Sequence, residues 1–126
     1  MDVIKILSDL IKINTTNPPG NEKRITQYII ERFKGYEDII EIDNGENRAS
    51  LIINIPGSTE ETVAFIGHID TVPVSDPSVW KYPPFDAQIE GDLMYGRGTS
   101  DMKSGVACMI SLGEYFIKNK IKPNKK

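Results

Sequence analysis

Apolar residues near the N-terminus recur at helical spacing over two segments. The first segment predicts an amphipathic helix over residues 2–13, with charged residues on the opposite side. Residues 14–20, which contain Pro18 and Pro19, end this helix because proline cannot continue it. A second helix is predicted over residues 22–34, with Asn21 as its N-cap. Its buried face would consist of Ile25, Ile29, Ile30 and Phe33.

Short runs with β-strand character follow the two helices. A weak run covers residues 39–42 and a stronger one residues 50–55, which ends at Pro56-Gly57. Residues 62–68 (Thr-Val-Ala-Phe-Ile-Gly-His) are almost continuously apolar. Such a run is typical of a central strand buried on both faces of a sheet.

The remaining segments predict a hairpin and a last helix. After a loop over residues 76–84, residues 85–95 have Gly91-Asp92 at their middle and predict a hairpin. A helix over residues 103–120 then follows, and the order of elements indicates an α/β fold, a layered mixed sheet flanked by helices. The residues after this helix should lead into a return strand, because a βαβ helix brings the chain back to the same sheet. We therefore expect an incomplete fold.

Composition narrows the classes of function. The chain has 126 residues, enough for one small domain, and a formal net charge of −3. Five lysines crowd the end from Lys118 onward, while all 18 acidic residues precede them; a solvated helix end is favoured over a nucleic-acid tail. No run suits a signal peptide or a membrane span, so we expect a cytoplasmic protein without membrane or nucleic-acid partners. The single cysteine, Cys108, lies in an apolar helical run and is expected in the core.

His68 and Asp70 are the first candidates for chemistry. They follow the strongest predicted strand, and open α/β sheets place their ligands at the carboxyl ends of strands. Two residues apart on an extended chain, their side chains point the same way. A neutral imidazole binds zinc well, and a neighbouring carboxylate can fix its tautomer. By itself, the pair also fits residues that end a strand and cap the next turn.

Asp101 is the second candidate, within the glycine-rich run 96–105. A phosphate-binding loop is excluded because Met102, not glycine, precedes Lys103-Ser104. A dinucleotide loop is excluded because Asp101 occupies the position of its third glycine. An aspartate held by a glycine-rich turn suits a carboxylate shared between metal ions, although an N-capping aspartate fits equally well.

Taken together, three segments resemble a known family of zinc hydrolases. Residues 67–73 (GHIDTVP), 80–85 (WKYPPF) and 93–103 (LMYGRGTSDMK) occur in the order seen in acetylornithine deacetylase, succinyl-diaminopimelate desuccinylase, aminoacylase and the glutamate-releasing carboxypeptidases. Residues 15–22 also resemble that family's loop between its first two helices. The resemblance covers nearly the whole chain and is specific in combination, although each segment alone is a weak signal.

The resemblance implies roles for the candidate residues. His68 would bind one metal ion, Asp101 would bridge two, and Asp70 would orient His68. The ions would be Zn²⁺, with Co²⁺ or Mn²⁺ possible for a mixed histidine and carboxylate site. The peptide bond between Asp101 and Met102 is expected to be cis. Thr99 and Ser104 depart from the alanine and glycine common in the family, but neither change removes a ligand.

The implied reaction is metal-assisted hydrolysis of the amide bond of an N-acyl amino acid or small peptide. The family's general-base glutamate belongs to a Glu-Glu pair on the strand after Asp101, whereas Glu60-Glu61 here precede His68. Residues 1–126 are therefore interpreted as the N-terminal portion of a catalytic domain, without its remaining ligands or inserted dimerisation domain. A full-length form could be a homodimer. The alternative is a non-enzymatic fragment or binding module that retains relic motifs.

This interpretation predicts that the purified 126-residue chain binds metal weakly and does not hydrolyse N-acyl amino acids. Catalytic zinc ions need about three protein ligands each, and His68 and Asp101 supply fewer. The test is a hydrolysis assay with acetyl- and succinyl-amino acids in the presence of Zn²⁺. Turnover above the metal-only blank would contradict the prediction.

Overall fold

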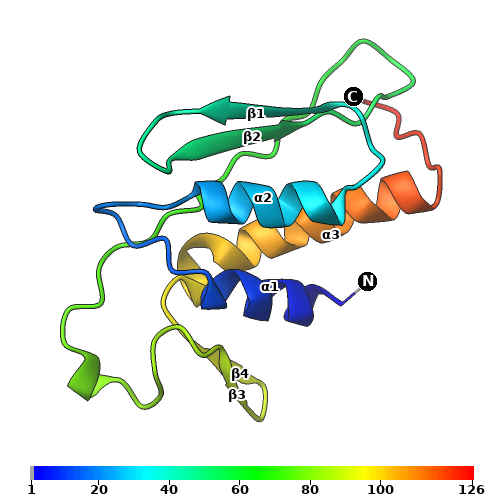
Figure 1. The fold of residues 1–126 in the computed structure, drawn as a ribbon. Helices are drawn as coiled ribbons and strands as arrows, with labels where there is room; N and C mark the ends of the chain where they lie inside the picture. The colour runs from blue at the N-terminus through cyan, green and yellow to red at the C-terminus, as the bar shows by residue number, and fades with distance from the viewer. Residues whose placement is uncertain (1) are drawn as a thin grey trace.

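The structure, a computed structural model, describes residues 2–126 and is an α/β arrangement (Figure 1). Its elements are α1 (Val3–Lys12), α2 (Lys23–Arg32), β1 (Ile39–Asp43), β2 (Ala49–Ile53), β3 (Gln88–Glu90), β4 (Leu93–Tyr95) and α3 (Ser104–Lys118). The hairpin of β1 and β2 forms one layer above α2 and α3, while α1 lies on the other side of α3 (Figure 1). The predicted α/β class is confirmed. Within residues 2–126, no helix is both long enough and apolar enough to cross a membrane.

The first helix forms where the periodicity predicts it. The Asp2 side chain accepts a hydrogen bond from the Lys5 backbone N–H at 3.1 Å and so caps the N-terminus of α1. Ile6, Leu10 and Ile11 are fully buried on its inner side. The helix ends at Lys12, ahead of the proline-containing loop.

The second helix begins differently from the prediction. Asn21 has a φ of 74° and is not the N-cap; Glu22 precedes the helix without a side-chain cap. An N-cap residue usually has an extended backbone, which the left-handed Asn21 lacks. The Glu22 carboxylate instead forms an ion pair with Arg48 at 2.7 Å and thereby ties the start of α2 to the end of the β1–β2 turn.

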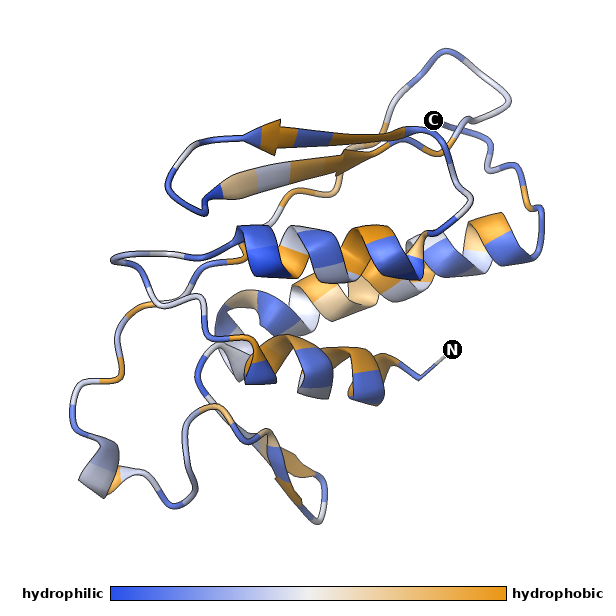
Figure 2. Cartoon of the chain, viewed as in Figure 1, coloured by the Kyte–Doolittle hydropathy of each residue, from blue (hydrophilic) through white to orange (hydrophobic). Residues whose placement is uncertain are grey.

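The core lies between the helices and the inner face of β2. Strands β1 and β2 pair in antiparallel register, with Ile39 opposite Ile53 and Asp43 opposite Ala49. Leu51 and Ile53 of β2 pack against the buried cluster. That cluster comprises Ile6, Leu10, Ile25, Ile29, Phe33, Val106, Ala107 and Ile110. Hydrophobic and hydrophilic residues alternate along α1 and α2 in Figure 2, as expected for helices with one buried face.

Residues 62–68 do not form the predicted buried central strand. They belong to no strand, and Phe65 and Ile66 are 67% and 84% exposed. The physical reason is the lack of neighbours: a central strand is buried by strands on both sides and layers on both faces, and no strand within residues 2–126 pairs with this segment.

The predicted hairpin is confirmed as β3 and β4, which pair in antiparallel register around Gly91-Asp92. The loop before it is held by aromatic contacts: the Tyr82 ring lies edge-on to Tyr95 at 5.1 Å, and the Arg97 guanidinium lies 5.0 Å above the Trp80 ring. The placement of Cys108 in the core was wrong, because this residue is on the exposed side of α3.

We predict that Ile6→Ala destabilises the chain by about 2–5 kcal/mol, because it removes a fully buried side chain and leaves a cavity. Ile4→Ala is the matched control, since Ile4 lies on the same helix and is 52% exposed. Urea unfolding followed by circular dichroism measures both. Equal losses in the two variants would show that α1 is not anchored through this face.

Candidate metal centre

His68 lies at the end of the extended segment, where its two ring nitrogens face different carboxylates. Nδ1 is 3.1 Å from both the backbone oxygen and Oδ1 of Asp70. Nε2 is 2.9 Å from Oδ1 of Asp101. The hydrogen bond to Asp101 is the main cause that raises the pKa of His68, and partial burial opposes it. The structure therefore brings all three predicted site residues into one chain of contacts, Asp70–His68–Asp101.

Asp70 is held by the loop that follows α1. The Asn17 side-chain amide donates to Asp70 Oδ2 at 2.9 Å, which is the main cause that lowers the pKa of Asp70. The same loop pairs in parallel with the chain around Asp70: the backbone N–H of Thr71 donates to Thr15 O, and that of Asn17 donates to Thr71 O. The Thr15 hydroxyl donates to Ile69 O at 2.7 Å. These bonds leave Asp70 Oδ1 directed at His68.

Asp101 is presented by the glycine-rich turn before α3. Gly98 has a φ of 88°, and a Cβ there would lie 2.7 Å from the Thr71 side chain, so only glycine fits the close approach. The Asp101–Met102 peptide bond is cis, as the resemblance implied. The Asp101 side chain is 88% exposed, apart from its contact with His68. The turn therefore places a largely solvated carboxylate beside an imidazole.

Lys103 was not among the predicted site residues, although it ends the segment 93–103 that resembles the family. Its side chain is fully buried, and its ammonium donates to the Leu10 and Ile13 carbonyls at 2.9 and 2.8 Å. These carbonyls belong to the C-terminal end of α1, where a cation is favourable. Burial lowers the pKa of Lys103 to about 8. Hydrophobic periodicity gives no reason to expect a buried lysine. The one indication in the sequence that Lys103 belongs to the site is its position two residues after Asp101.

The donor set fits a divalent metal ion in part. His68 and Asp101, whose Nε2 and Oδ1 atoms are in contact, both border a small cavity of about 160 Å³, which also contacts Val72 and residues 96–100. The contact that these two atoms share would have to open for both to bind one ion, and Asp101 is exposed enough to move. Within residues 2–126, no group of three or more His, Cys, Asp or Glu side chains could hold a metal. Two donors fall short of the three that a catalytic zinc usually has.

We predict that Thr15→Val destabilises the chain by about 1–3 kcal/mol, because it leaves the Ile69 carbonyl without its hydroxyl donor. Thr16→Val is the matched control, since the Thr16 hydroxyl donates no hydrogen bond within residues 2–126. The free energy of unfolding in urea measures both. A loss for Thr16→Val as large as that for Thr15→Val would show that the loop is held by its backbone alone.

Comparisons with known proteins show relatives of similar sequence and a solved structure of similar fold. The chain is 30% identical to an uncharacterized metallohydrolase of Methanocaldococcus jannaschii over 97% of its length, and 34% identical to a probable succinyl-diaminopimelate desuccinylase of Staphylococcus aureus over 85%. It spans 33% and 26% of those proteins. An M20 family metallo-carboxypeptidase of Sulfolobus solfataricus shares its fold, with a TM-score of 0.73 and 23% identity over 95% of this chain and 28% of that one.

The family profile covers the segment that carries the site. The profile of peptidase family M20/M25/M40 matches residues 64–126, which include His68, Asp70 and Asp101. Relatives named as a metallohydrolase and as a desuccinylase are consistent with this match. The chain therefore belongs to peptidase family M20/M25/M40, a family of metal-dependent hydrolases.

Proposed function

We propose that this chain supplies the N-terminal half of a dinuclear metal site in an amidohydrolase. The observation that carries the proposal is the contact chain Asp70–His68–Asp101, in which an imidazole lies between two carboxylates. One carboxylate is anchored by Asn17, whereas the other is largely solvated apart from its contact with His68. That asymmetry suits one carboxylate that orients a histidine and a second that binds metal.

The three side chains would have different roles in such a site. His68 would give one ion its Nε2 lone pair, and Asp101 would share its carboxylate between two ions. Asp70 would hold the Nδ1 proton of His68 and so keep the imidazole in the tautomer that frees Nε2. A divalent ion bound there would supply Lewis acidity for hydrolysis. Zn²⁺ is the expected ion, with Co²⁺ or Mn²⁺ as alternatives.

The substrate class follows from the family resemblance and from the name of one relative. An N-acyl amino acid or a small peptide is the proposed substrate, with the amide bond as the bond cleaved. The Staphylococcus relative is named as a probable desuccinylase, which favours a deacylase reaction. We further propose a cytoplasmic location, and a homodimer for a longer form. The 126-residue chain alone is expected to be inactive, because no glutamate within residues 2–126 borders the cavity at His68 and Asp101 to serve as the general base.

A second candidate is a binding module that keeps these motifs without catalysis. The observation in its favour is that residues 2–126 contain no cluster of three metal-binding side chains. Under this alternative, the His68–Asp101 contact is only a surface hydrogen bond. Metal affinity therefore separates the two candidates.

We predict that the chain binds Zn²⁺ weakly and that His68→Ala and Asp101→Asn each remove this binding. Asp70→Asn should retain the ligands but weaken the affinity by about 10–100-fold, because it changes the group that orients the imidazole. Isothermal titration calorimetry with Zn²⁺ gives the affinities, and Co²⁺ absorption in the visible range reports the donors.

Asp92→Asn is the control, since Asp92 is an exposed carboxylate in the β3–β4 turn away from the site. It should bind as the unaltered chain does. Metal binding that survives both His68→Ala and Asp101→Asn would refute the assignment of ligands. An absence of binding in the unaltered chain would favour the second candidate.

A further inference from the structure

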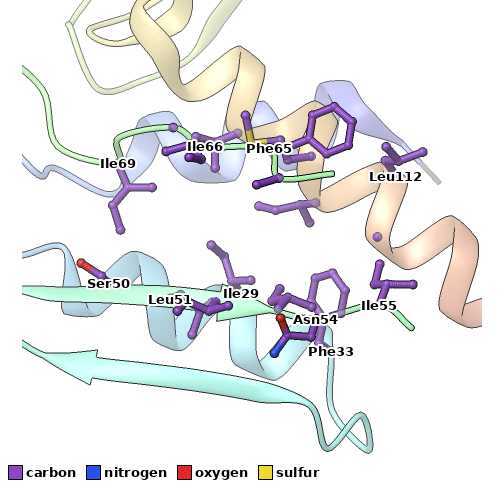
Figure 3. A pocket seen from close by; sticks show the side chains of 18 of the residues that line it. Ile29, Phe33, Ser50, Leu51, Asn54, Ile55, Phe65, Ile66, Ile69 and Leu112 are labelled. Carbon is purple, nitrogen blue, oxygen red and sulfur yellow. The ribbon is translucent and has the colours of Figure 1, made fainter. Parts of the chain in front are cut away.

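Two cavities border His68, and they differ in polarity. The larger one measures about 1250 Å³ and lies between β2 and residues 62–69. The side chains labelled in its close-up are mostly apolar, among them Leu51, Ile55, Phe65 and Ile66 (Figure 3). A charged group buried among such side chains would lose its hydration without gaining a partner. The smaller cavity, of about 160 Å³, is bordered by Arg97 and Asp101, so a charged part of a ligand belongs there.

Within residues 2–126, Arg97 is the only lysine or arginine that borders the smaller cavity. Arg32 and Arg48 each form an ion pair with a glutamate. In the same described range, no carboxylate lies within ion-pair distance of Arg97. Its Nε is buried without an acceptor. A half-buried guanidinium without an acidic partner favours an anionic ligand, because hydrogen bonds between ionised groups are the strong ones.

The two lysines nearest to Arg97 in the sequence already have partners. Lys103 is fully buried, and its ammonium donates to two carbonyls of α1. Lys81 forms an ion pair with Glu90. Neither lysine offers an uncompensated charge to a ligand in the smaller cavity, which leaves Arg97.

The Arg97 side chain is held in place by the loop before β3. Its Nη2 donates to Pro73 O at 3.2 Å, and its guanidinium lies 5.0 Å from the Trp80 ring. The backbone N–H of Arg97 donates to Pro84 O at 2.6 Å. Since a guanidinium has several N–H donors, the bond to Pro73 leaves others for a ligand. A side chain fixed in this way loses little conformational entropy when it binds.

We propose that Arg97 recognises a carboxylate group of the substrate. The identity of this ligand rests on the proposed function: an N-acyl amino acid carries a carboxylate on its amino-acid half, and a succinyl group carries one on the acyl half. A planar guanidinium matches a carboxylate through two parallel hydrogen bonds. Because Arg97 borders the same cavity as His68 and Asp101, recognition takes place beside the candidate metal ligands.

Asp101 sets an electrostatic condition on this recognition. It is the only carboxylate within residues 2–126 that borders the smaller cavity, and it repels an anion there. A carboxylate bound at Arg97 is therefore subject to one attractive and one repulsive charge. In the metal-free chain, its affinity should increase when Asp101 loses its charge.

The test is an NMR titration of the metal-free 126-residue chain at low ionic strength, where charges are least screened. The ligands are N-acetylglycine, with a carboxylate on its amino-acid half, N-succinylglycinamide, with one on its acyl half, and the neutral N-acetylglycinamide. The Nε–H signals of the four arginines and the amide signals of residues 96–101 report binding. We expect saturable shifts at Arg97 with at least one of the two acids and none with the neutral amide. A response to only one acid identifies the half of the substrate that Arg97 recognises.

Variants assign the binding to Arg97. Arg97→Gln should weaken the carboxylate affinity by about tenfold, because it removes the charge-assisted hydrogen bonds. Arg97→Lys should weaken it less, since lysine keeps the charge but not the planar fork. Asp101→Asn should strengthen it. Arg24→Gln is the matched control and should change nothing, since Arg24 is exposed and borders neither cavity.

Equal shifts with the neutral amide would overturn the proposal, and so would a carboxylate affinity that Arg97→Gln leaves unchanged. An affinity that does not respond to Asp101→Asn would overturn it as well, because the carboxylate would then lie outside this cavity. Circular dichroism shows whether each variant keeps the fold; if Arg97→Gln does not, Arg97→Lys and Asp101→Asn decide. No metal enters these measurements, so failure here is distinct from failure of the metal site, which the Zn²⁺ titration tests.

Discussion

The C-terminal end of α1 is the fixed point on which the candidate site depends. The buried Lys103 ammonium binds the Leu10 and Ile13 carbonyls there and so ties down the turn that carries Asp101. The next residues of the chain hold the other half of the site, because Thr15 bonds to Ile69 and Asn17 bonds to Asp70. Both halves are therefore anchored to a single short stretch of backbone.

In this arrangement, the residues that fix the backbone differ from the residues that could bind a ligand. The anchors Thr15 and Lys103 are fully buried, whereas His68 and Asp101 are 47% and 88% exposed. A buried cation without compensation would be very costly, and two carbonyls at the C-terminal end of α1 offset part of its desolvation, which still lowers the pKa of Lys103 to about 8. The exposed side chains can then meet a ligand, while their backbone remains fixed by groups that water does not reach. Preorganised ligands supported by buried hydrogen bonds are what a metal site requires.

The sequence predicted the features that local interactions determine. The buried faces of α1 and α2 follow from the spacing of apolar residues, and the β3–β4 turn follows from its turn residues. The turn at Gly98 follows from its glycines, since Gly98 has a positive φ. The chain of contacts Asp70–His68–Asp101 followed from the family resemblance, because no local rule brings residues 33 positions apart together.

The failures share a dependence on distant parts of the chain. Asn21 looked like an N-cap, but its own backbone is left-handed, and the start of α2 is held instead by Asn47 and Arg48 of the β1–β2 turn. Cys108 lies in an apolar run, yet the periodicity of one helix does not show which side its neighbours cover. Lys103 is buried because α1, more than 90 positions away for Leu10, presents carbonyls to it. In each case, the residues that decide the outcome are too distant in the sequence for hydrophobic periodicity to reveal them.

Residues 62–70 illustrate how one segment can serve both stability and chemistry. Its apolar part, with Phe65 and Ile66, borders the larger cavity, and its polar end provides His68 and Asp70. Any contact that ordered the backbone of the apolar part would also restrict the position of His68, the proposed metal ligand. Ligand binding to a native arrangement stabilises that arrangement in turn. Order in the apolar part of this segment and metal affinity at His68 should therefore be thermodynamically coupled, because both act on the same few residues of backbone.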